Sequence, residues 1–256
     1  MSKQVVMGKI QGQGMIAPGI YKMIIHAPEA AKTAKCGQFI NVYPKSESTI
    51  LPRPISISEI GEETLTIIYA VVGKGTDEFS NYKEGDSIRI STALGNGFIV
   101  EEDKKVSVLV GGGIGVPPLV ELAKQIKGEK IAVLGFREDP ILVETLEALG
   151  VKVHIATDGG KVGFKGNVIE LIERENITGD YFYACGPKVM LKALAMHCDA
   201  KAVPVQVSME ERMGCGYGVC VGCVIKIKEN SEKGYVLKKV CKDGPVFLGN
   251  EVKWDE

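Results

Sequence analysis

Strong charge of one sign, long apolar runs and paired histidines are all missing from this sequence. Its formal net charge is −1, so the composition indicates neither a nucleic-acid ligand nor an anionic membrane surface. The three histidines, His26, His154 and His197, lie far apart and show no metal-ligand or catalytic-triad spacing. We therefore interpret each of them as a packed or surface residue rather than as a catalyst.

No apolar run approaches the roughly 18 residues that a membrane-spanning helix needs. The longest, from Val106 to Val120, is interrupted by four glycines and two prolines. The first residues lack the apolar core of a secretory signal. We therefore expect a cytoplasmic protein. Thiols stay reduced in that compartment, and clustered cysteines there serve metal or redox chemistry more often than disulfides.

The chain of 256 residues is long enough for two domains and a small appendage. Residues 1–100 contain short segments rich in Ile, Val and Tyr, separated by glycine, proline or charged turns, which predict strands. Their spacing favours a small antiparallel β-barrel with one short helix after "GKGT". The predicted strands are 20–27, 37–44, 53–60, 64–72 and 86–94.

Residues 101–207 alternate between strand-like and helix-like segments, which predicts a parallel-sheet α/β domain with helices on both faces. The predicted strands are 106–110, 131–136, 151–158, 180–185 and 202–210, and the predicted helices are 117–128, 139–150, 166–176 and 187–198.

Residues 208–256 hold a cluster of cysteines and a predicted hairpin, 223–229 with 235–241. This segment is too short to bury a core alone, so we expect a metal or packing on the second domain to stabilise it.

Four of the seven cysteines, Cys215, Cys220, Cys223 and Cys241, belong together. Their spacing, C-x₄-C-x₂-C followed by a distant cysteine, is typical of plant-type 2Fe–2S proteins. Such a cluster takes two thiolates on each iron from a closely wrapped backbone, and the interspersed glycines allow that approach. The alternative is a structural zinc site, although zinc ribbons usually pair two C-x₂-C knuckles.

A glycine-rich turn, "GGGIG" at 111–115, joins a predicted strand to a predicted helix, where helix N-termini bind phosphate. It does not match G-x-G-x-x-G, and many such loops only pack a helix on a sheet. "YACGP" at 183–187 should reach the same carboxyl edge of the sheet, where α/β proteins bind ligands; alternatively, it is a turn with one buried cysteine. If a nicotinamide cofactor binds at this edge, Arg137 suits a 2′-phosphate, but the adjacent Glu138 and Asp139 favour NADH over NADPH.

The barrel segment offers a cation and a hydroxyl on one strand, Arg53 and Ser56 in "RPISI". Thr76 in "GKGTDEF" is a candidate helix N-cap. Together these groups would suit a pyrophosphate and a polar heterocycle. Alternatively, Arg53 is a solvated strand residue and Thr76 serves only as a cap.

The order of motifs resembles that of the ferredoxin–NADP reductase superfamily: "RPIS", "GKGT", "LGNGF", "GGGIGVPPL" and "YACGP". The ending "SMEERMGCGYGVCVGCVIKI", followed by "KKVCKDGPVF", resembles one branch, the electron-transfer subunits of NAD-dependent, two-subunit dihydroorotate dehydrogenases. The similarity spans essentially the whole chain. It implies an FAD-binding β-barrel at 1–100, an NAD-binding α/β domain at 101–207 and a 2Fe–2S cluster-binding segment at 208–256.

The resemblance also implies roles for individual residues around FAD. Arg53 would contact the pyrophosphate and Ser56 would lie near the flavin ring. Many relatives carry a basic residue where this chain has Ala70, so we expect one phosphate or ribose contact to be missing or replaced. The full set implied to contact FAD is Arg53, Pro54, Ile55, Ser56, Ile68, Tyr69, Ala70, Gly75 and Thr76.

Two further sets follow from the same resemblance. Residues implied to face NADH are Gly111, Gly112, Gly113, Gly115, Cys185, Gly186 and Pro187. Residues implied to hold the cluster are Cys215, Cys220, Cys223 and Cys241.

These cofactors would work as a two-to-one electron transformer, because NADH gives a hydride, a cluster carries one electron and a flavin handles both. The family implies an FMN-containing catalytic partner that oxidises dihydroorotate to orotate in de novo pyrimidine (UMP) biosynthesis, in a two-plus-two heterotetramer. One alternative is an NAD(P)H-dependent reductase subunit for another partner, of the sulfhydrogenase or ferredoxin-dependent type. Another is a zinc-stapled nucleotide-binding regulator without a redox role.

Overall fold

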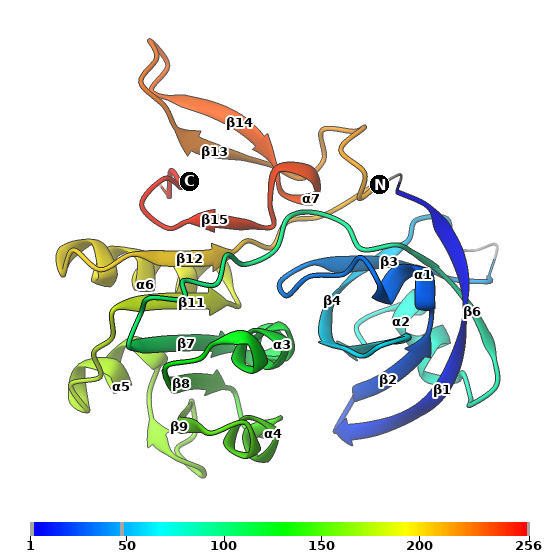
Figure 1. Ribbon diagram of the computed structural model, residues 1–256, viewed down its shortest axis with the longest axis horizontal. Helices are drawn as coiled ribbons and strands as arrows, with labels where there is room; N and C mark the ends of the chain where they lie inside the picture. Colours follow the sequence, from blue (N-terminus) through cyan, green and yellow to red (C-terminus); the bar gives the residue numbers. More distant parts are fainter. Residues whose placement is uncertain (1–2, 47–48, 255–256) are drawn as a thin grey trace.

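A computed structural model describes residues 3–46 and 49–254. A β-barrel lies beside a layered α/β unit, and a small hairpin near the C-terminus lies above the sheet in the view of Figure 1. None of the helices in the described ranges is long and apolar enough to cross a membrane. The predicted combination of antiparallel barrel, parallel-sheet α/β unit and small C-terminal segment is confirmed.

The barrel closes in the strand order β1-β2-β5-β4-β3-β6, with antiparallel neighbours throughout. Alternate side chains point inward and fill it with β-branched and aliphatic groups, as the period of two requires. Its elements are β1 (Val5–Ala17), β2 (Ile20–His26), α1 (Pro28–Ala31), β3 (Phe39–Tyr43), β4 (Arg53–Ile60), β5 (Thr64–Ala70), α2 (Lys74–Ser80) and β6 (Ser87–Ser91).

Strand β1 is absent from the sequence-based expectations. Three glycines, Gly8, Gly12 and Gly14, interrupt its apolar alternation, and glycine is a poor strand former. The strand forms because it pairs with β2 on one side and β6 on the other, which closes the barrel.

The second unit is a seven-stranded sheet in the order β10-β9-β8-β7-β11-β12-β15. Helices α5 and α6 pack in the core on one face of this sheet, and α3 and α4 in the core on the other. Its elements are β7 (Val106–Gly112), a 3₁₀ turn (Gly113–Gly115), α3 (Pro117–Gln125), β8 (Glu129–Phe136), α4 (Val143–Ala148), β9 (Val151–Thr157), β10 (Phe164–Lys165), α5 (Val168–Arg174), β11 (Tyr181–Cys185), α6 (Lys188–Ala200) and β12 (Val205–Ser208).

The C-terminal segment packs on this sheet instead of forming a separate core. Its strand β15 (Val246–Leu248) pairs antiparallel with β12, so a sheet that is otherwise parallel gains an antiparallel edge. The predicted hairpin is present as β13 (Val224–Lys228) and β14 (Tyr235–Lys239), followed by α7 (Val240–Asp243). Cys223, Cys241 and Trp254 are buried in the same core cluster as Val205 and Val207.

Candidate cofactor sites

A cavity of about 340 Å³ opens where the barrel meets the carboxyl edge of the sheet. Barrel residues from β4, β5 and α2 form one wall, and the 3₁₀ turn and the end of β11 form part of the other. The predicted residues that line it are Arg53, Pro54, Ile55, Ser56, Ile68, Tyr69, Ala70, Thr76, Gly115, Cys185 and Gly186. The two sets implied for FAD and for NADH therefore meet in one cavity.

The other predicted nucleotide-site residues do not line the cavity but lie within three positions of residues that do: Gly75, Gly111, Gly112, Gly113 and Pro187. A Cβ at Gly75 would lie 2.7 Å from Arg53 Nε, so this glycine lets the guanidinium rest on the first turn of α2. Gly112 packs in the same way on Pro187. Gly111 faces the side chain of Leu119 in α3. This glycine therefore allows the helix to pack on the sheet, which is the alternative role of the loop given in the sequence analysis. Gly113 adopts a positive φ of 53° in the turn.

Thr76 is not the N-cap of its helix, contrary to the sequence-based prediction. Helix α2 has Gly73 as its N-cap, and Thr76 is the third helical residue. The Thr76 hydroxyl accepts hydrogen bonds from Val72 N (2.9 Å) and Gly73 N (3.2 Å), which closes the turn from inside the helix. The prediction was wrong because a threonine at the third helical position can also bind the backbone of the N-cap, so its presence near the start of a helix does not identify the cap.

The two glycine motifs of the α/β unit touch each other. A Cβ at Gly115 would lie 2.4 Å from Cys185 O, so only glycine allows the turn after β7 to lie on the end of β11. Burial raises the pKa of the Cys185 thiol to about 12, so this cysteine is neutral near pH 7. Its contribution to the cavity is shape rather than nucleophilic chemistry.

Several cavity residues were not predicted from the sequence. The segment after β12 supplies a buried methionine, Met209, and two carboxylates, Glu210 and Glu211, of which Glu211 lies 3.5 Å from Lys188 Nζ. The available signal was position, because β12 ends at the same edge of the sheet as β11. The remaining unpredicted lining residues are Phe39, Val72, Ile114, Ser208, Met213 and Pro245.

The four clustered cysteines form two interacting pairs. The Cys215 thiol interacts with that of Cys220, and the Cys241 thiol with that of Cys223. Cys223 and Cys241 are buried, whereas Cys215 and Cys220 are partly exposed. Two pairs of thiols match the requirement of a 2Fe–2S cluster for two thiolates on each iron.

The backbone around Cys215 favours a thiolate. Burial opposes ionisation of this thiol, but hydrogen bonds from backbone amides, those of Cys220 and Tyr217 foremost, lower its pKa to about 6. Burial, and then the neighbouring Cys223 thiol, raises the pKa of Cys241 to about 12. Metal coordination removes the proton from such a thiol outright.

The barrel holds the cysteine loop through side chains of β3. Asn41 Nδ2 donates to Cys215 O (3.0 Å), and the hydroxyls of Tyr43 and Tyr217 lie 2.7 Å apart. Gly216 has a φ of 73°, and a Cβ there would lie 2.5 Å from Asn41 Nδ2. Glycine at 216 is therefore required both by the backbone conformation and by the close approach to the barrel.

The thiol geometry bears on the zinc alternative. A structural zinc ion needs four ligands around one centre, whereas a 2Fe–2S cluster takes two thiolates on each of two irons. The pairing of Cys215 with Cys220 and of Cys223 with Cys241 matches the second arrangement.

Comparisons with known proteins agree with this geometry. Residues 210–253 match the model of the iron–sulfur cluster binding domain of dihydroorotate dehydrogenase B. The electron transfer subunit of dihydroorotate dehydrogenase B (NAD(+)) from Caldanaerobacter subterraneus subsp. tengcongensis is 42% identical over 93% of this chain and 94% of that relative. The same subunit from Clostridium perfringens is 36% identical over 99% of this chain and 100% of its own length. This chain belongs to that family of electron transfer subunits.

Solved structures extend the comparison of the fold. The structure of an NADH-dependent reduced ferredoxin–NADP oxidoreductase, described in the context of flavin-based electron bifurcation, has a TM-score of 0.86 and 29% identity. The structural match covers 98% of this chain and 91% of the chain of that oxidoreductase. A ferredoxin NADP⁺ reductase from Neisseria gonorrhoeae, with a TM-score of 0.61 and 21% identity over 73% of this chain and 87% of that one, shares the fold. Membership of the electron transfer subunit family confirms the prediction of an NAD-linked oxidoreductase subunit.

Proposed function

We propose that this chain passes electrons between NAD(H) and the FMN of a dihydroorotate dehydrogenase catalytic subunit, through FAD and a 2Fe–2S cluster, in de novo pyrimidine (UMP) biosynthesis. One observation carries the proposal. The cavity between barrel and sheet is lined by Ser208, Met209, Glu210, Glu211 and Met213, and the first cluster cysteine, Cys215, follows two residues after Met213. The nucleotide cavity and the cluster loop are therefore adjacent parts of one continuous backbone.

The chemistry of the cavity wall fits FAD and NADH. Bound FAD would supply both hydride chemistry with NADH and single-electron chemistry with the cluster. Arg53 is the cation that would bind the pyrophosphate, because its guanidinium rests on the first turn of α2. Ala70 lines the cavity without adding a charge, so we expect one phosphate or ribose contact to come from elsewhere. Apolar side chains such as Ile55 and Ile114 would exclude water from the reacting atoms.

We assign the three functional units to 1–100 for FAD, 101–207 for NAD and 208–256 for the cluster. Gly115, Cys185 and Gly186 line the cavity together with barrel residues, which supports our placement of the nicotinamide there. The acidic pair after Arg137 favours NADH over NADPH, in agreement with the NAD(+) in the names of the curated relatives.

The cluster loop presents apolar side chains for a partner. Val219 and Val221 flank Cys220 and are 83% and 72% exposed. Exposed apolar groups beside a redox ligand suit a protein–protein contact through which electrons leave the chain. We assign this contact to the FMN-containing catalytic subunit, in a two-plus-two heterotetramer in the cytoplasm, where the seven free cysteines of the chain stay reduced.

A second candidate is a reductase subunit that serves a ferredoxin-dependent partner. It is favoured by the similarity to the NADH-dependent reduced ferredoxin–NADP oxidoreductase over nearly the whole chain. The identity of 29% is lower than the 36% and 42% shared with the electron transfer subunits of dihydroorotate dehydrogenase B.

The test is an anaerobic visible spectrum of the purified chain before and after NADH, then with the catalytic subunit and dihydroorotate. We expect flavin and iron–sulfur bands that bleach with NADH. In the complex, dihydroorotate should bleach the same bands. A colourless protein that contains zinc would refute the redox function, and bleaching by NADH without any response to dihydroorotate would favour the second candidate.

A further inference from the structure

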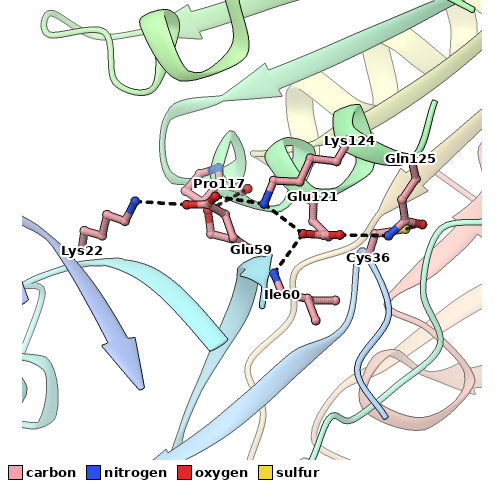
Figure 2. Close-up of polar contacts among 9 residues, drawn as sticks. Lys22, Cys36, Glu59, Ile60, Pro117, Glu121, Lys124 and Gln125 are labelled. Carbon is pink, nitrogen blue, oxygen red and sulfur yellow. Dashed lines mark hydrogen bonds and ion pairs between the residues drawn. The ribbon is translucent and has the colours of Figure 1, made fainter. Parts of the chain in front are cut away.

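A polar network crosses the interface between the barrel and helix α3, outside the set of cavity-lining residues (Figure 2). Its centre is Glu121 of α3, which is 7% exposed. The Glu121 carboxylate accepts hydrogen bonds from Ile60 N (2.9 Å) and Gln125 Nε2 (3.1 Å), and lies 3.4 Å from Lys124 Nζ. A buried carboxylate on the helix therefore binds a backbone amide at the end of β4.

A second link joins the same two elements. Lys124 Nζ of α3 donates to Glu59 of β4 (3.0 Å), and Lys22 of β2 donates to the other oxygen of the same carboxylate (3.1 Å). Burial opposes ionisation of Glu59 and Lys124, but their mutual hydrogen bond and charge lower the pKa of Glu59 and raise that of Lys124. Ser58 Oγ also donates to Pro117 O (3.1 Å).

The two linked elements each carry one wall of the cavity. Strand β4 begins with Arg53–Ser56, on the flavin side. Helix α3 begins at Pro117, and only Val116 separates it from the turn Gly113–Gly115 on the nicotinamide side. Domains joined by a modest interface move relative to each other by default, whereas hydride transfer needs reacting atoms held about 3–3.5 Å apart. A short, partly buried set of bonds from α3 to β4 opposes that motion.

We propose that Glu121 and Lys124 are positioning residues for hydride transfer, because they hold the nicotinamide wall at a fixed distance from the flavin wall. The inference rests on the proposed function of the cavity. Neither side chain lines the cavity, so each acts through the placement of α3 rather than through contact with a cofactor.

The rate measurement compares three substitutions, two at Lys124 and one at Lys22, in the FAD-loaded, cluster-loaded chain. Lys124→Met removes the cross-domain ion pair, and Lys124→Arg retains it. Lys22→Met is the matched control, because it removes the ion pair of Lys22 with the same Glu59 inside the barrel and leaves α3 untouched. The limiting rate of flavin bleaching by NADH should fall on the order of tenfold in Lys124→Met, less than the ~100-fold cost of a 1 Å misplacement. Lys124→Arg should restore the rate and Lys22→Met should keep it.

A readout independent of activity is hydrogen exchange at the Ile60 amide, the donor to Glu121. It should accelerate in Glu121→Met, which removes the acceptor, and in Lys124→Met, and stay slow in Lys22→Met, while the FAD dissociation constant is unchanged in all variants. If Lys124→Met and wild type show the same rate of flavin bleaching and the same hydrogen exchange at the Ile60 amide, the positioning role is overturned and the proposed function still stands. Equal losses in Lys22→Met and Lys124→Met would also overturn the positioning role, because they would show general loosening of the barrel. A wild type that binds FAD but is not bleached by NADH would refute the proposed function itself.

Discussion

Gly115 allows two backbone segments of the cavity wall to touch, so alanine at this position is the sharpest perturbation. The added Cβ would lie 2.4 Å from Cys185 O and 2.6 Å from Gly186 N, whereas ordinary contact begins at 3.4 Å. These neighbours are backbone atoms and cannot rotate away. The turn after β7 and the end of β11 must therefore separate by about 1 Å. Overpacking of this kind costs ~1–3 kcal/mol in the free energy of unfolding.

The functional effect of Gly115→Ala should be larger than its effect on stability. A misplacement of 1 Å lowers the rate of a positioned reaction by ~100-fold, so we expect a fall of that order in the limiting rate of flavin bleaching by NADH. Stopped-flow absorbance measures this rate, and denaturant unfolding measures the stability. The matched control is Gly159→Ala in the same unit, where an added Cβ meets nothing within 4 Å. If Gly115→Ala bleaches its flavin and unfolds as the wild type does, the close contact between the turn after β7 and the end of β11 is refuted.

Three further predictions concern the cluster, the partner and acid stability. Cys220→Ser should abolish electron transfer to the partner but leave flavin bleaching by NADH intact; loss of bleaching in a folded variant would contradict the separate roles. Joint Val219→Lys and Val221→Lys substitution should raise the dissociation constant for the catalytic subunit at least tenfold, by ~1.4 kcal/mol or more, with an unchanged visible spectrum; calorimetry that shows unchanged affinity would exclude this surface. The lowered pKa of Glu59 means that its carboxylate adds stability above pH 4.5, which is lost as the pH falls through the lower folded value. The stability advantage of wild type over Glu59→Gln should therefore shrink in unfolding experiments below pH 4.5, and a constant difference would count against the ion pairs.

Local sequence patterns predicted most of the elements around the site. The strand–turn–helix around "GGGIG" and the strand that ends within "YACGP" are present as β7, α3 and β11, because apolar runs bounded by glycine and proline define them locally. The cysteine spacing indicated the cluster for the same reason, since its first three ligands lie within nine residues. Strand β1 and the N-cap of α2 were missed, because long-range pairing and a side chain reaching back along the helix outweighed local propensity.

The sequence alone determined the class of fold, the cluster-type spacing and the family resemblance, since each depends on local patterns and on the order and spacing of motifs along the chain. Only the tertiary structure decided that the barrel motifs and the α/β motifs face one cavity and that the segment after β12 completes its wall. It also placed Asn41 of β3 against the cysteine loop, and Glu121 of α3 against the end of β4. The physical reason is that these contacts join residues far apart in sequence, and their geometry follows from the packing of whole strands and helices.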